Sequence, residues 1–219
     1  MRTDVPVRLG RDGTELVRRP EAFESFREEF DRNHAVRLRE FLAPDLLAFL
    51  QERLEVEAFE TTSYPGVGTE MRQASGVAAQ ALLFVMNDPA LLDAVSRLSG
   101  CENVGSFAGR IYRLKHEAWQ LDAWHDDDVE GRLLALSINL SARPFDGGVL
   151  EMREAASKRV HGRFDNTVPG DALLFRIGPM LEHRVTTVTG PNPKTSFAGW
   201  FYPGPRVLVA SGAPRLDAP

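Results

Sequence analysis

The apolar segment Leu133-Leu-Ala-Leu-Ser-Ile-Asn-Leu140 predicts a β-strand and represents the pattern of the second half of the chain. From about Val104 onward, apolar residues recur with a period of two. Turn-forming residues separate the apolar segments at 146–148 (Asp-Gly-Gly), 169–171 (Pro-Gly-Asp) and 190–193 (Gly-Pro-Asn-Pro). No long amphipathic helix interrupts them, which favours a sandwich or jelly roll over βαβ units. The six predicted strands are Phe107–Leu114, Leu133–Leu140, Val149–Arg153, Ala172–Arg176, Glu182–Thr187 and Ser196–Tyr202.

The first hundred residues follow a helical period instead. Phe23, Phe26 and Phe30 fall at i, i+3 and i+7, which predicts one apolar stripe facing a core. Asp12-Gly13 is a hairpin turn signal. Residues 61–75 predict a loop and a candidate substrate lid, with Tyr64, Met71 and Arg72 on it. The predicted helices begin near Pro20, at Ala43-Pro44-Asp45 and at Asn87-Asp88-Pro89, and the last of them ends at Gly100.

Composition limits the function classes. The 219 residues are 43% hydrophobic and carry 26 basic and 31 acidic side chains, a net charge of −5, which argues against nucleic acid as a partner. We expect one domain over 1–219, with a helical part and short hairpin at 1–100, a jelly-roll core at 101–203 and a tail at 204–219. No secretory signal or membrane span is evident, so the expected location is the cytoplasm. The sequence leaves the oligomeric state open.

The strongest chemical signal is His125-Asp126-Asp127, just ahead of the apolar strand at 133–140. In an extended chain, residues i and i+2 point the same way, so His125 and Asp127 are expected to share a face. They supply two of the three ligands of a 2-His-1-carboxylate site, which binds Fe(II) and leaves positions open for other ligands. His183, on a late strand, is the preferred third ligand. His161 competes for that role but lies in a basic stretch interpreted as a surface loop.

Lys194 lies 194 − 183 = 11 positions after His183 and opens the next strand. Alternation places Lys194, Ser196 and Trp200 on one face. A cation that points into a β core needs a partner, because an unpaired buried charge is very costly, and a ligand carboxylate would supply one. Trp200 itself is interpreted as a core residue, whereas Trp119 and Trp124 flank the metal motif and are candidates for the pocket mouth.

These residues, in this order, resemble the 2-oxoglutarate and iron(II)-dependent oxygenases, and most closely the prolyl-hydroxylase-like branch. The resemblance covers about Val104–Tyr202. The Gly-Gly turn within 145–150 and the turn and strand at 169–175 also resemble family features. The resemblance implies a mainly β fold with added helices: a double-stranded β-helix (jelly roll, cupin-like) core preceded by N-terminal helices.

The resemblance also implies roles for single residues. His125, Asp127 and His183 would bind Fe(II), and Lys194 would pair with the C5 carboxylate of 2-oxoglutarate, helped by Ser196. The cosubstrates would be 2-oxoglutarate and O₂, and ascorbate is a further candidate cofactor. From strand parity, two more side chains are expected to face the cosubstrate: Tyr112 and Asn139.

The implied reaction is hydroxylation of an unactivated C–H bond, with succinate and CO₂ as coproducts. Halogenating relatives replace the carboxylate by a small residue, so Asp127 favours hydroxylation. Desaturation, cyclisation and epimerisation stay open, as does a non-catalytic cupin-like protein that binds a metal or ligand. A Mg²⁺ site at Asp126–Asp128 for phosphoryl chemistry fits poorly, because no Gly-rich phosphate loop is present. The absence of an extra binding domain favours a small-molecule substrate over a protein.

Overall fold

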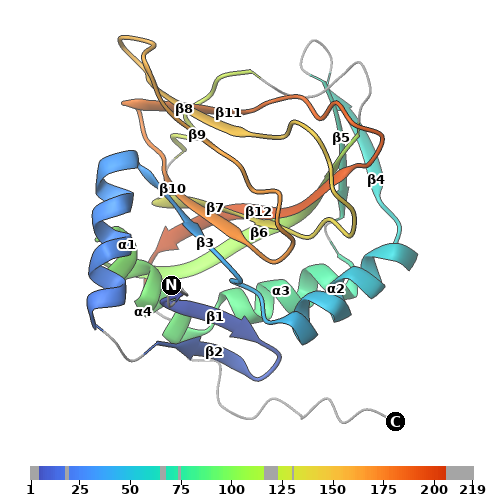
Figure 1. The fold of residues 1–219 in the computed structure, drawn as a ribbon, viewed down its shortest axis with the longest axis horizontal. Helices are drawn as coiled ribbons and strands as arrows, with labels where there is room; N and C mark the ends of the chain where they lie inside the picture. The colour runs from blue at the N-terminus through green and yellow to red at the C-terminus, as the bar shows by residue number, and fades with distance from the viewer. Residues whose placement is uncertain are drawn as a thin grey trace.

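The computed structural model describes residues 5–17, 20–64, 68–73, 75–115, 123–129 and 131–205. Within them, a seven-stranded sheet (the major sheet) has the strand order β3-β10-β7-β12-β6-β5-β4, and a three-stranded sheet (the minor sheet) has the order β11-β8-β9. Figure 1 shows the minor sheet lying over one face of the major sheet, with the helices against the other. All pairings between these named strands are antiparallel.

The strand bounds follow chain order. A separate two-stranded hairpin, β1 (Val7–Gly10) with β2 (Gly13–Leu16), precedes the two sheets. The major sheet consists of β3 (Ala35–Leu38), β4 (Glu60–Tyr64), β5 (Gly68–Gln73), β6 (Val104–Leu114), β7 (Leu134–Asn139), β10 (Ala172–Arg176) and β12 (Lys194–Pro203). The minor sheet consists of β8 (Leu150–Glu154), β9 (Val160–Phe164) and β11 (Leu181–Val185).

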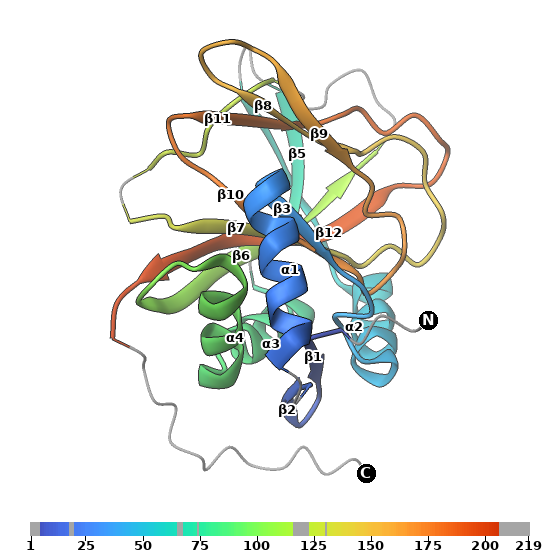
Figure 2. The same cartoon turned by 60° about the vertical axis from the view of Figure 1, so that its left-hand side comes forward.

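Four helices cover the outer face of the major sheet: α1 (Pro20–Asn33), α2 (Pro44–Val56), α3 (Val77–Met86) and α4 (Pro89–Ser99) (Figure 2). The predicted limits of α4 are confirmed. The Asp88 side chain accepts a hydrogen bond from the Ala90 amide, and Gly100 ends the helix with a φ of +70°. Among the described residues, no single helix is long and apolar enough to cross a membrane; only α3 and α4 together reach that length, and they are bent by 65°.

Strand alternation divides the apolar side chains between two cores. On β12, Phe197 and Phe201 are fully buried and pack with the helices. The opposite face of the major sheet packs on the minor sheet around Phe175, Met152 and Leu181. The site residues described below belong to this second layer, between the two sheets, as in a jelly roll.

The predicted strands and the N-terminal hairpin are present, with ends displaced by a few residues. Two predictions are wrong. The segment at 61–75 is a strand pair, β4 and β5, in place of a loop, and the basic stretch around His161 is strand β9. All three strands consist mostly of polar residues, and β4 and β9 are edge strands, so the sequence shows no apolar period to detect. The expected tail after residue 205 lies outside the described residues, as do His116 and Trp119.

Candidate metal centre

One backbone pairing joins the two histidines of the predicted set. The amide of His125 donates to the carbonyl of His183 at 3.0 Å, and the amide of His183 donates back to the carbonyl of His125 at 2.7 Å. Residues that exchange both bonds lie directly opposite each other with their side chains on one face. The ring centroids are accordingly 4.3 Å apart. Strand β11 therefore delivers the second imidazole to the segment that carries the first.

Asp127 completes the cluster through a turn. Its φ of +56° is left-handed, so the extended geometry expected for 125–127 does not hold at this residue. Its Oδ2 lies 3.3 Å from Nε2 of His183, and its Oδ1 lies 4.0 Å from Nε2 of His125. One ligand atom from each of the three side chains lies within 4.8 Å of the other two. Asp126 and Asp128 are exposed.

Three neighbours orient the ligand atoms. The Nε1–H of Trp200 donates to Oδ2 of Asp127 at 2.8 Å, and Nη1 of Arg132 donates to Oδ1 at 3.2 Å. Nδ1 of His125 lies 2.9 Å from the carbonyl oxygen of Ala123. A proton on that Nδ1 would leave the Nε2 lone pair free for a metal, which is the usual arrangement of histidine ligands.

The electrostatics suit a divalent cation. Burial opposes ionisation of Asp127, but hydrogen bonds from His183 and Trp200 outweigh it and lower its pKa, so the carboxylate is charged at neutral pH. Burial lowers the pKa of His183, which favours the neutral imidazole that a metal needs. Two neutral imidazoles and one carboxylate are the donor set of non-haem Fe(II) sites. The residues present therefore fit iron.

His161, the competing ligand, lies elsewhere. It is on β9, with its ring 5.0 Å from that of His34 and its Nε2 3.4 Å from Oε1 of Glu154. Within the described ranges, the cluster of 125, 127 and 183 is the one group of three metal-ligating side chains close enough to share an ion. The choice of His183 over His161 agrees with this geometry.

Lys194 lies between the sheets with its ammonium buried. Its Nζ donates to the carbonyl of Gly148 at 2.6 Å and lies 5.8 Å from the ring centroid of Phe145. No carboxylate of the described residues lies within 4.0 Å of it. Burial lowers its pKa to about 8. A buried cation without a counter-ion is the feature expected where an anionic ligand binds.

Tyr112, Ser196 and Asn139 form one row across three strands of the major sheet. Ser196 pairs with Tyr112 on β6 and with Asn139 on β7, so the three side chains share a face, as strand parity predicts. Asn139 is fully buried; its Oδ1 accepts from the amide of Ser141, whereas its Nδ2 has no hydrogen-bond partner in the structure. An unsatisfied buried donor beside Lys194 and Ser196 suits an oxygen-rich ligand.

Sequence reasoning missed the partners of Asp127. Trp200 was interpreted as a core residue, and it does pack against the second core, but its N–H also holds the carboxylate. Arg132 was not considered; its guanidinium lies 3.6 Å from the ring centroid of Trp200. Trp124, a candidate for the pocket mouth, has the guanidinium of Arg153 at 4.1 Å and that of Arg184 at 4.7 Å from its ring centroid. These contacts join the segment before His125 to strands β8 and β11.

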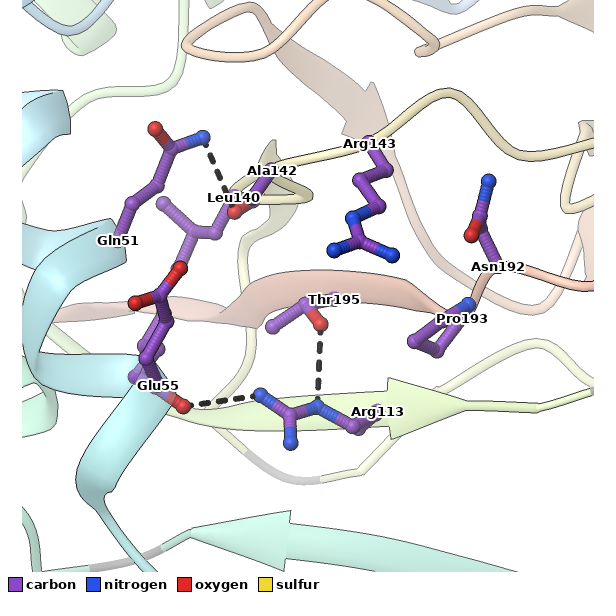
Figure 3. A pocket seen from close by; sticks show the side chains of 10 residues that line it. Gln51, Glu55, Arg113, Leu140, Ala142, Arg143, Asn192, Pro193 and Thr195 are labelled. Carbon is purple, nitrogen blue, oxygen red and sulfur yellow. Dashed lines mark hydrogen bonds between the residues drawn. The ribbon is translucent and has the colours of Figure 1, made fainter.

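A separate cavity of about 310 Å³ opens on the helix side of the major sheet. Thr195 and Arg113, which line it, alternate with Lys194 and Tyr112 and so face away from the candidate metal centre. Figure 3 shows Arg113 donating to Thr195 beneath Arg143 and Asn192. This cavity is not the site described above.

Comparison with known proteins agrees with the geometry. Residues 111–202 match the model of the 2OG-Fe(II) oxygenase superfamily, a region that contains the three clustered side chains and Lys194. This region of the chain is thus similar to the 2OG-Fe(II) oxygenase superfamily. No curated protein matches the sequence.

Solved structures share the oxygenase fold at low identity. A 2OG-Fe(II) oxygenase family protein from Burkholderia pseudomallei superposes with a TM-score of 0.63 at 16% identity, covering 91% of this chain and 98% of its own. A Pseudomonas putida prolyl-4-hydroxylase superposes with a TM-score of 0.59 at 21% identity, and the match covers 83% of this chain and 99% of the hydroxylase. A third structure is the epimerase SnoN from nogalamycin biosynthesis in complex with Fe3+, alpha ketoglutarate and nogalamycin RO. It superposes with a TM-score of 0.59 at 13% identity, and the match covers 92% of this chain and 93% of SnoN. At these identities, the similarity establishes the jelly-roll fold.

Proposed function

We propose that this protein is an Fe(II)- and 2-oxoglutarate-dependent dioxygenase that hydroxylates an unactivated C–H bond of a small molecule or an amino-acid-like substrate, with succinate and CO₂ as coproducts. One observation carries the proposal: two imidazoles and a carboxylate converge within 4.8 Å in the same intersheet layer as a buried lysine that has no carboxylate partner among the described side chains. A metal site alone would not require that lysine.

Each side chain has a definite task. His125, Asp127 and His183 would hold the iron and leave coordination positions open for other ligands. The bound iron and 2-oxoglutarate supply the activation of O₂ and the oxidation of the C–H bond. Lys194 would hold the distal carboxylate of the cosubstrate. Its ammonium is buried, so an ion pair there is little screened by solvent.

Asp127 also bears on the outcome. A carboxylate at this position would bind the iron, whereas halogenating relatives have a small residue there, which favours hydroxylation over chlorination. Epimerisation is the main alternative among oxidative outcomes, because one protein of the same fold is an epimerase. A non-catalytic metal-binding protein is a weaker alternative, because it gives no reason to bury the charge of Lys194.

The decisive experiment is anaerobic addition of Fe(II) and 2-oxoglutarate to the purified protein. A chelated 2-oxo acid on iron gives a visible charge-transfer band, which we expect for the wild-type chain and not for His183→Ala. His161→Ala is the matched control, because it removes an imidazole away from the cluster and should keep the band. A colourless mixture with the folded wild-type protein would contradict the proposal.

Product analysis separates the oxidative outcomes. Hydroxylation adds one oxygen atom to the substrate and releases one succinate per product. Epimerisation leaves the substrate composition unchanged, whereas desaturation and cyclisation remove two hydrogens. Mass spectrometry of substrate and product, run with a succinate assay and with ascorbate to keep the iron reduced, decides among them.

A further inference from the structure

Two arginines share the inner face of the major sheet with the candidate cosubstrate residues. Arg72 on β5 pairs with Tyr112 on β6, and Arg110 on β6 pairs with Ala198 on β12. Directly opposed residues lie on the same face of a sheet, and Ser196, which pairs with Tyr112, marks that face. Both arginines therefore lie on the side that the minor sheet covers.

The residue that follows each arginine along its strand faces the helices, which supports this assignment. Gln73 follows Arg72 on β5, and its side chain bonds to Glu57, just after α2. Ile111 follows Arg110 on β6 and lies in the helix-side core. Because neighbours along a strand point to opposite faces, Arg72 and Arg110 point into the space between the sheets.

Among the described residues, neither arginine has an acidic partner. Both are partly buried, and Nε of Arg72 is buried with no hydrogen-bond partner in the structure. Glu60 lies opposite Arg72 on β4, but its side chain is exposed and the two form no ion pair. In the part of the chain that the structure describes, no carboxylate oxygen lies within 4.0 Å of either guanidinium. Arg132, by contrast, is paired with Asp127.

We propose that Arg72 and Arg110 bind an anionic group of the substrate, a carboxylate or a phosphate, so that the substrate class is a small anion. The proposal rests on the proposed function, because it places the substrate in the same site. Arg72 pairs with Tyr112, and Arg110 lies two residues before Tyr112 on β6. The two arginines are therefore diagonal neighbours on adjacent strands, with Cα atoms about 7–8 Å apart. One anion can therefore contact both guanidinium groups.

The pairing pattern also limits the size of the substrate. Ala198, opposite Arg110, is two residues from Trp200, whose indole contacts the carboxylate of Asp127. Two residues span about 7 Å along a strand. An anion at the arginines therefore leaves room for only a few carbon atoms before the reacting C–H bond, which is the scale of an amino acid. Lys194 belongs to a different row and would remain with 2-oxoglutarate.

The charges would also set selectivity. Guanidinium groups that are partly desolvated and unpaired favour a carboxylate or phosphate, and a neutral analogue leaves them without a partner. The same molecule as an acid and as its amide should therefore bind with different affinity. The overall charge of −5 makes nonspecific anion binding a poor explanation for such a difference.

The test uses N-acetyl derivatives of the common amino acids, each as the free acid and as the primary amide, with ligand-observed NMR. The metal-free chain of 219 residues is used with saturating 2-oxoglutarate, so that binding is measured independently of turnover. We expect at least one acid to bind about 10-fold more tightly than its amide. The variants Arg72→Gln and Arg110→Gln should abolish that preference, whereas Arg72→Lys and Arg110→Lys should retain part of it.

Two control variants make the result specific. Arg143→Gln removes the same charge from an exposed arginine at the helix-side cavity and should leave the preference intact. Arg11→Gln should also leave it intact, because Arg11 is exposed and lies beside Asp45, outside the site. Equal binding of acids and amides, no binding of either, or a preference that survives both glutamine variants would overturn the proposal. A missing charge-transfer band with a retained acid preference would instead contradict the proposed function.

Discussion

The indole N–H of Trp200 donates a 2.8 Å hydrogen bond to Oδ2 of Asp127, a residue 73 positions earlier in the chain. Oδ1 of the same carboxylate accepts from Arg132, whose guanidinium stacks on the Trp200 ring. Each oxygen of this carboxylate thus accepts a hydrogen bond from a residue outside the metal-ligating cluster. Such outer contacts fix the orientation of a carboxylate before a metal binds.

Replacing Trp200 by Phe should therefore weaken metal binding while keeping the aromatic packing. Loss of an outer hydrogen bond of this kind typically lowers metal affinity about 10- to 100-fold. Titration with Mn(II), followed by electron paramagnetic resonance, measures the affinity without turnover. Trp124→Phe is the matched control, because Trp124 contacts arginines of the minor sheet instead of the carboxylate. Equal Mn(II) affinity in both variants would show that the indole N–H does not position Asp127.

His183→Ala should abolish tight binding of one divalent ion per chain, because it removes one of three ligand atoms and leaves two. His161→Ala removes another histidine of the late strands, but its ring contacts His34, so this variant should leave the stoichiometry at one. Isothermal titration with Zn(II) in place of iron counts the sites. If His161→Ala were the variant that lost the site, the ligand assignment would have to be revised.

The sequence predicted the helices and strands that have a strong apolar period. It did not predict the contacts that depend on the tertiary arrangement of distant segments. His125, Asp127 and His183 could be selected because their residue types limit the chemistry, and the late strand carrying His183 has an apolar neighbour at 173–175. Trp200 could not be selected in this way, since a tryptophan side chain most often packs in a hydrophobic core. Its hydrogen bond depends on how β12 passes the turn at Asp127, which no local pattern encodes.

The missed strands have a similar cause. Strand β9 reads Val-His-Gly-Arg-Phe and β4 reads Glu-Thr-Thr-Ser-Tyr, so neither has the apolar alternation that reveals a half-buried strand. Their partners, β8 and β5, supply the hydrogen bonds that make them strands. The inner-face position of Arg72 also depends on this pairing. It could not be placed while residues 61–75 were interpreted as a loop.

Burial of Lys194 predicts a pH dependence of stability. Its pKa is about 8 in the folded chain and 10.5 ordinarily, so between these values the unfolded chain binds more protons and stability rises with pH. Below about pH 8, the cost of burying the charge is fully present. Melting temperatures of wild type and Lys194→Met, measured from pH 7 to about pH 10.5, should show a rise specific to the wild type. Saturating 2-oxoglutarate should remove that difference, because an ion pair raises the lysine pKa. Parallel curves for the two ligand-free proteins would contradict a buried ammonium.

Gly148 is required for the path of Lys194. It adopts a φ of +63°, and a Cβ at this residue would lie 2.8 Å from Cδ of Lys194 and 3.2 Å from Cε2 of Phe145. Gly148→Ala should therefore strain the backbone and also displace the lysine, raising the KM for 2-oxoglutarate by about 10-fold if one charge-assisted contact is lost.

Gly178→Ala separates these two effects. Gly178 also has a positive φ, +140°, but a Cβ there meets nothing within 4 Å. This variant should lose stability through backbone strain and keep the wild-type KM for 2-oxoglutarate. Thermal melts and succinate assays on both variants make the comparison. An unchanged KM in a folded Gly148→Ala protein would mean that Lys194 reaches its position without the space that the glycine provides.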